Sequence, residues 1–150
     1  MKHSILAAAV LALSAAPGLA GDPAAGEAAF NQCQTCHVVE NPAGEVLAGR
    51  AGRQGPNLYG VVGRQAGTVE GFRYQAAIVE AGEQGLIWTE ETLVPYLLNP
   101  QDFLRETLND RRARSGMSHR VRNEDMARDL VAFLGQFGSD ENGDEDAPAD

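Results

Sequence analysis

Eight glycines fall within residues 38 to 71, a density that argues against extended helices or strands in that segment. They stand at positions 44, 49, 52, 55, 60, 63, 67 and 71. The chain has 150 residues, which suggests one domain, and so long a loop is unusual inside a compact domain. We therefore expect the loop to pack on a bound cofactor, which would supply the surface it needs.

The residues just before this loop indicate which cofactor that is. Cys33-Gln34-Thr35-Cys36-His37 has the pattern C-x-x-C-H, the attachment signature of c-type haem. Two thiols separated by two residues can add to the two vinyl groups of one haem. The adjacent His37 is then directed at the iron. The motif predicts one covalently attached haem c.

Three other uses of the cysteine pair compete with haem. A thioredoxin-like redox pair belongs near a βαβ pattern, which the sequence lacks. A zinc site needs four ligands, and only His119 remains beyond His37 after residue 20. A structural disulfide is the third use, but two intervening residues make a tight loop for one. Haem is the favoured interpretation.

The sixth iron ligand has three candidates, Met117, His119 and Met126. Met126 lies on the apolar side of the last expected helix, and we interpret it as a core methionine. Met117 follows Gly116 in a loop, where a glycine lets the backbone approach the ring closely. We favour Met117, with His119 as its competitor. A filled sixth position favours electron transfer over catalysis.

Helical spacing and capping residues predict an all-α fold of four or five short helices, with no convincing strand. The first helix covers 24–36, with Asp22 as its cap and Ala25, Ala29 and Phe30 in the core. The expected later helices are 72–81 stopped by Gly82, one from Thr89 to Asn99-Pro100, 101–108, and one from Asn123 to Gly138. Residues 111–122 are expected to form a basic loop.

The ends of the chain differ from its middle. Lys2, the apolar run 5–16 and the small residues Gly18 and Ala20 predict a secretory signal peptide cleaved near Ala20. A retained anchor or a buried helix are the alternatives. Residues 139–150 contain six acids and no base, and their composition is that of a solvated disordered tail. We expect a signal peptide at 1–20, a folded domain at 21–138 and the tail.

With these features in place, the chain resembles the class I c-type cytochromes, and among them the large bacterial cytochromes c2. The resemblance covers nearly all of residues 21 to 138. The matching segments are GDPAAGEAAFNQCQTCH, GPNLYGVVGRQAG, IWTEETLVPYLLNP, RARSGM and NEDMARDLVAFL. It implies a class I cytochrome c fold around one haem, with His37 and Met117 as the iron ligands.

The resemblance also implies roles for residues around the haem. The Pro56 carbonyl would accept a hydrogen bond from His37. Arg64, Tyr74 and Trp88 would bind a buried haem propionate, and Tyr96 would lie beside the Met117 sulfur. Gly26 and Phe30 of the first helix would pack on Leu130 and Phe133 of the last. One departure is Ser118-His119, where a small and then an aromatic residue are expected.

The charge pattern bears on partners. The formal net charge is −9. Residues 105–122 nonetheless contain six arginines and two acids, a net charge of +4, next to Met117. We expect this region to dock on acidic surfaces of membrane redox complexes, unless its charges are spread around the rim. An acidic tail argues against nucleic-acid binding.

Together these features predict a periplasmic, monomeric, single-electron carrier rather than an enzyme. The resemblance implies a cytochrome bc complex as electron donor and a photosynthetic reaction centre or terminal oxidase as acceptor, in photosynthesis or respiration. Two rival classes remain. A haem enzyme or gas-binding protein would need an open or bis-histidine iron, and a thiol–disulfide protein would need free Cys33 and Cys36.

Overall fold

The computed structural model describes residues 21–50 and 52–138. The expected signal peptide at 1–20 and the acidic tail at 139–150 lie outside the described residues. Seven elements follow in chain order: α1 (Pro23–Phe30), β1 (Val38–Glu40), β2 (Val46–Gly49), α2 (Ala76–Glu83), α3 (Glu90–Leu98), α4 (Pro100–Thr107) and α5 (Glu124–Leu134). The predicted all-α class is confirmed, with five short helices.

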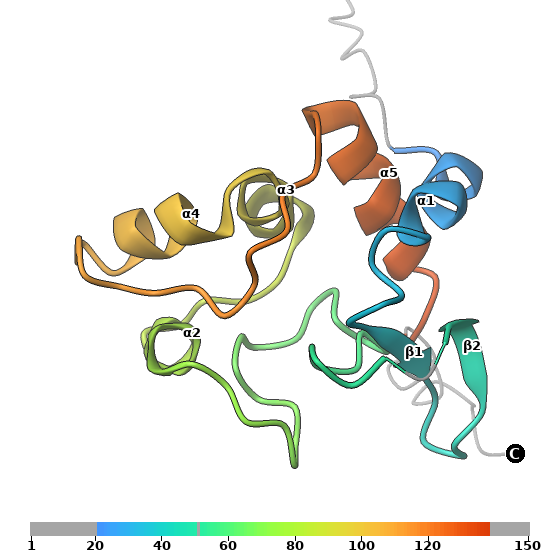
Figure 1. The fold of residues 1–150 in the computed structure, drawn as a ribbon, viewed down its shortest axis with the longest axis horizontal. Coiled ribbons are helices and arrows are strands. Elements are labelled where there is room, and N and C mark those ends of the chain that lie inside the picture. The colour runs from blue at the N-terminus through green and yellow to red at the C-terminus, as the bar shows by residue number, and fades with distance from the viewer. Residues whose placement is uncertain (1–20, 51, 139–150) are drawn as a thin grey trace, which may run out of the picture.

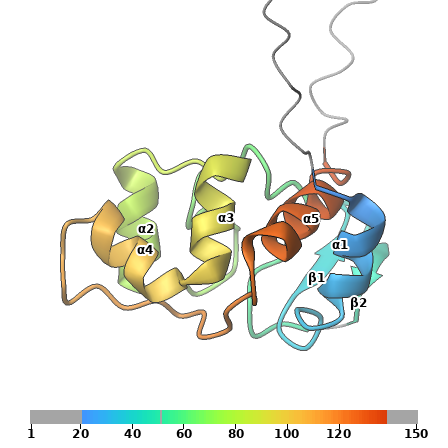
Figure 2. The ribbon, with the colours of Figure 1, turned by 90° about the horizontal axis from the view of Figure 1, so that it is seen from above.

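The helices form two groups (Figures 1 and 2). One group contains α1 and α5, which cross with the β1–β2 hairpin beside them, and the other contains α2, α3 and α4. Long irregular segments join the two groups. Within the described residues, no helix combines the length and the apolarity needed to cross a membrane.

The α1–α5 crossing depends on a missing side chain. A Cβ on Gly26 would overlap the Asp129 carbonyl oxygen and lie 2.7 Å from the Phe133 Cβ. The two backbones can therefore approach closely, and the Phe30 and Phe133 rings pack at a tilt with 5.5 Å between their centroids. The implied packing of Gly26 and Phe30 on α5 is confirmed. The prediction that Ala25 is a core residue is wrong, because Ala25 faces outwards.

Side-chain caps stand at the starts of three helices, and those at Asp22 and Asn123 were predicted. The side chains of Asp22, Asn99 and Asn123 each accept a hydrogen bond from a backbone N–H in the first turn of α1, α4 and α5. Such caps satisfy donors that have no partner inside the helix. At α3, the Thr92 hydroxyl accepts from the Thr89 N–H at 2.8 Å.

Two predictions of local structure are wrong. Residues 38–71 were expected to be loop, yet within them β1 and β2 form an antiparallel hairpin with an irregularity between Val39 and Glu40. The second helix covers 76–83 instead of 72–81, and Gly82 lies inside it. A Cβ on Gly82 would overlap the Ala66 carbonyl oxygen, so this glycine permits a close approach instead of ending the helix. The chain turns at Gly85, whose φ is +100°.

Two other helices are shorter than expected. α1 ends at Phe30 and gives way to tight turns through the C-x-x-C-H residues, and α5 ends at Leu134 instead of Gly138. Residues 111–122 contain no helix or strand, as predicted. This segment runs back along α4 towards α5 (Figure 1, orange).

Candidate haem site

The C-x-x-C-H residues form a compact turn directly after α1. The Cys33 N–H donates to the Phe30 carbonyl at 2.8 Å, and the His37 N–H donates to the Cys33 carbonyl at 2.9 Å. Both sulfurs are free and half-buried. Burial, with a smaller contribution from Cys36, raises the pKa of the Cys33 thiol to about 11.

The imidazole of His37 is oriented by a backbone carbonyl. Its Nδ1 lies 2.9 Å from the Pro56 oxygen. Because a carbonyl can only accept, Nδ1 carries the proton and Nε2 keeps its lone pair for a metal. Burial lowers the pKa of His37, which favours the neutral ring. The geometry agrees with the role that the resemblance implied for Pro56.

The loop that presents Pro56 is bonded to the haem-attachment turn and to β1. The Gly55 N–H donates to the Cys36 carbonyl at 2.7 Å, and the Leu58 N–H donates to the Val38 carbonyl at 2.9 Å. Gly55 lies against the imidazole, since a Cβ there would be 2.6 Å from Nδ1 and 2.7 Å from Nε2 of His37. Only glycine fits at this position without displacing the ring.

Asn57 is a further structural residue of this loop, and it was not among the predicted site residues. Its side-chain oxygen accepts from the Glu40 N–H at 3.0 Å, and its amide nitrogen donates to the Glu40 carbonyl at 2.7 Å. These two bonds join the Pro56 loop to β1 as another strand would. Its place in GPNL, directly after Pro56, was the available signal.

The three residues expected to bind a propionate are brought into one region. The backbone N–H of Trp88 donates to the Arg64 carbonyl at 2.9 Å, and the Trp88 side chain is buried. The Arg64 guanidinium donates to the carbonyls of Tyr59 at 2.8 Å and Asn57 at 3.1 Å. Burial lowers the pKa of Arg64, and the nearby Tyr74 opposes that shift. Burial also raises the pKa of Tyr74, so its hydroxyl stays a proton donor.

Met117 is half-buried against the core and is held by Ser115. The Met117 N–H donates to the Ser115 hydroxyl at 3.1 Å, and that hydroxyl lies 2.9 Å from the Met117 carbonyl, to which it can donate. Burial raises the pKa of Tyr96, and the nearby Ser115 side chain opposes that shift. Tyr96 and the Met117 backbone thus both lie near Ser115. Ser115 was not predicted as a site residue, although it lies within RARSGM.

Aromatic rings surround Tyr96. Its ring centroid lies 4.8 Å from that of Trp88 and 5.7 Å from that of Phe103. Phe103 comes from α4 and was not among the predicted site residues. An apolar, aromatic wall of this kind suits a flat macrocycle, and it lowers the local polarity around a metal.

The two alternative sixth ligands have other partners. The His119 Nε2 lies 2.9 Å from the Gln32 side-chain oxygen, and His119 is exposed. The Gln32 amide nitrogen donates to the Met126 sulfur at 3.3 Å. Met126 packs partly against the core, as predicted.

The basic segment exposes most of its charge. Arg111, Arg112, Arg114, Arg120 and Arg122 are exposed. Arg105 is half-buried and pairs with Asp102 at 3.4 Å, and Arg112 lies 3.7 Å from Asp110. The other four arginines of the 105–122 region form no ion pair with any residue that the structure describes.

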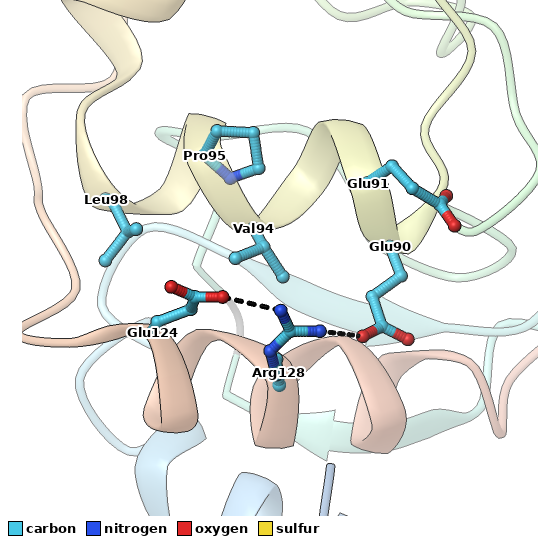
Figure 3. A pocket seen from close by; sticks show the side chains of 7 residues that line it. All are labelled: Glu90, Glu91, Val94, Pro95, Leu98, Glu124 and Arg128. Atoms are coloured by element: carbon cyan, nitrogen blue, oxygen red, sulfur yellow. Dashed lines mark hydrogen bonds and ion pairs between the residues drawn. The ribbon is translucent and has the colours of Figure 1, made fainter. Parts of the chain in front are cut away.

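A surface pocket of about 290 Å³ lies between α3 and α5, away from the residues above. Figure 3 shows Arg128 of α5 reaching Glu90 of α3 and Glu124 of its own helix. The ion pair to Glu90 is 2.7 Å long. This network joins the two helices across the pocket, and its charged side chains are already paired with one another.

The residues described above fit a covalently bound haem. Two free thiols stand at the required spacing, the imidazole beside them has a fixed tautomer, and Gly55 leaves room for that ring alone. Among residues 21–50 and 52–138, no group of three histidine, cysteine or acidic side chains is placed to hold a metal ion. This donor set is that of a c-type cytochrome.

Comparison with known proteins gives the family. No family model matches the chain. Cytochrome c2 of Rhodovulum adriaticum is 53% identical over 120 residues, which are 80% of this chain and 95% of that protein. Cytochrome c-550 of Paracoccus denitrificans is 41% identical over 155 residues, covering 100% of this chain and 97% of that one. The crystal structure of cytochrome c2 from Rhodobacter sphaeroides superposes with a TM-score of 0.77 at 47% identity, covering 79% and 97% of the two chains.

The chain therefore belongs to the bacterial cytochrome c2 family of class I c-type cytochromes. It carries one covalently bound haem c and acts in electron transport.

Proposed function

We propose that the protein is a periplasmic carrier of single electrons and not an enzyme, with its haem iron held by His37 and Met117. Thioether bonds from Cys33 and Cys36 attach the haem, which supplies a one-electron ferric/ferrous couple when bound. The observation that carries this proposal is the hydrogen bond from His37 Nδ1 to the Pro56 carbonyl, since it places the proton on Nδ1 and leaves the Nε2 lone pair for the iron.

The choice of Met117 over His119 rests on burial and on partners. Met117 packs against the core, whereas the exposed His119 is bonded to Gln32. Tyr96 lies near Ser115, whose hydroxyl is bonded to the Met117 backbone. A histidine–methionine pair raises the reduction potential and leaves no open position for a substrate. Arg64, Tyr74 and Trp88 would hold a propionate through their donors.

The spectrum of a Met117→Ala variant tests this ligand assignment. We expect the ferric wild-type protein to show the weak red band of sulfur-ligated iron, and the variant to lose it with a large fall in potential. Met126→Leu is the matched control, because it removes the other candidate sulfur from the folded domain and should keep the band. A band that survives in Met117→Ala, or an open or bis-histidine iron in the wild type, would contradict the assignment.

The segmentation of the chain is part of the same proposal. Residues 1–20 would direct export and be removed near Ala20, 21–138 would form the cytochrome domain, and 139–150 would remain as an acidic tail. Mass spectrometry of the protein purified from periplasm would give the cleavage position.

We further propose that the protein works as a monomer and docks through the 105–122 region on membrane redox complexes. A cytochrome bc complex would be the donor, and a photosynthetic reaction centre or a terminal oxidase the acceptor. The exposed arginines 111, 114, 120 and 122 support this proposal, because they lie in the segment that carries Met117. Acidic docking surfaces would attract them and increase the association rate.

Salt dependence tests the docking surface. We expect association with an isolated partner complex to slow by about ten-fold between low and high ionic strength, because salt screens attraction between exposed charges. Arg120→Gln should slow association at low salt. Arg50→Gln removes the same charge from an exposed site next to β2 and should have a smaller effect. Rates that stay flat or rise with salt would exclude electrostatic steering through this surface.

A further inference from the structure

Three side chains from distant parts of the sequence meet beside the haem-attachment turn. Gln32 directly precedes Cys33, His119 follows Met117 by two residues, and Met126 lies in α5. The Gln32 oxygen is 2.9 Å from the His119 Nε2, and the Gln32 nitrogen donates to the Met126 sulfur at 3.3 Å. We name this group, Gln32, His119 and Met126, the Gln32 clasp.

The chemistry of the clasp fixes which atoms donate. An amide has one oxygen that accepts and one nitrogen that donates. With the nitrogen of Gln32 directed at a thioether, its oxygen must accept from His119, so His119 carries its proton on Nε2. In that tautomer the His119 Nε2 has no lone pair available for iron. The clasp thus keeps the Nε2 of the competing imidazole occupied.

The clasp also holds residues 118–120, which lie between Met117 and Val121. On one side of that stretch, Ser115 bonds the backbone of Met117. On the other side, the Val121 N–H donates to the Leu97 carbonyl at 2.8 Å. Among the described residues, the bond from His119 to Gln32 is the only hydrogen bond of the exposed residues 118–120. The Met117 segment is joined to the haem-attachment turn at this point.

We propose that Gln32 and His119 are positioning residues that hold the Met117 segment closed against the turn that carries the haem. The proposal rests on the proposed role of Met117 as the sixth ligand. Breaking the clasp leaves the Ser115 and Val121 bonds in place, so the protein stays folded. It frees the intervening chain to move, and the sixth position opens more often. An external ligand then competes with Met117 more successfully.

Imidazole binding to the ferric holoprotein measures this opening. We expect His119→Ala and Gln32→Ala each to tighten imidazole binding about five-fold, and the double variant to add little, because both remove the same bond. His119→Gln, which can donate from its own amide nitrogen, should restore most of the wild-type affinity. Ser118→Ala alters an exposed neighbour with no hydrogen bond in the described structure, and it should leave the affinity unchanged.

Amide exchange of Val121 in the ferrous protein gives a second readout that does not depend on the iron ligand. Its N–H should exchange several-fold faster in both alanine variants, because the segment before it is released. Unchanged imidazole affinity together with unchanged Val121 exchange would overturn the clasp. If instead imidazole bound the wild type and Met117→Ala equally, the Met117 assignment would fail, and faster Val121 exchange would still support the clasp.

Discussion

Replacing Gly55 by alanine should displace the His37 imidazole and reduce the yield of correctly ligated holoprotein about ten-fold. The new Cβ would lie 2.6 Å from Nδ1 and 2.7 Å from Nε2 of the ring. Neither the ring nor the loop can easily move. The loop is bonded to Cys36 and to β1, and the ring is bonded to Pro56. The methyl group therefore acts directly on the proximal ligand.

Haem content and visible spectra after periplasmic expression would measure this effect. Thr35→Ala is the matched control, because Thr35 lies within the haem-attachment turn but is exposed. It should give holoprotein with the wild-type spectrum. A Gly55→Ala protein with wild-type yield and spectrum would mean that the loop can shift without cost. The proposed rigid placement of His37 would then be wrong.

Replacing Gly26 by alanine should destabilise the folded protein by about 3 kcal/mol. In an isolated helix the same change is favourable by about 1 kcal/mol, because glycine has the greater backbone entropy to lose. Here the added Cβ would overlap the Asp129 carbonyl oxygen and lie 2.6 Å from the Asp129 carbonyl carbon. Backbone atoms cannot rotate away, so α1 and α5 must separate. The Phe30–Phe133 contact would weaken with them.

Urea unfolding of the holoprotein measures the change in free energy. Gly135→Ala at the end of α5 is the control, because a Cβ there would lie 3.3 Å from the Val131 oxygen and 3.9 Å from Val62. Its φ of −65° suits alanine. We expect a change within about 0.5 kcal/mol for this control. If Gly26→Ala unfolded at the same urea concentration as the wild type, α1 and α5 could move apart without loss of stability, and the predicted effect would be wrong.

The features that the sequence predicted well are those whose cause lies within a few residues. The caps at Asp22 and Asn123 are side-chain bonds to the backbone two and three residues later, so they can be predicted from local order. The spacing of Cys33, Cys36 and His37 is likewise a local property, and it is sufficient to indicate the cofactor. The all-α class followed from helical spacing in the same way.

The errors concern features whose cause lies elsewhere in the chain. A glycine at position 82 predicts the end of a helix, but in the structure its missing side chain lets the Ala66 carbonyl, sixteen residues earlier, approach the helix. The hairpin needs β1 and β2 to pair across a turn, and neither strand has a strong pattern alone. Ala25 lies on a helix face that α5 does not cover.

The sequence by itself determined the haem motif, the short helices and their caps, because these depend on neighbouring residues and on residue chemistry. Only the tertiary structure decided which glycine lies against the His37 ring, which hydroxyl holds Met117, and which side chain His119 contacts. The hydrogen bond between His119 and Gln32 joins residues that are 87 positions apart. Such contacts form only when separate segments fold against each other, and no local pattern encodes the distance between them.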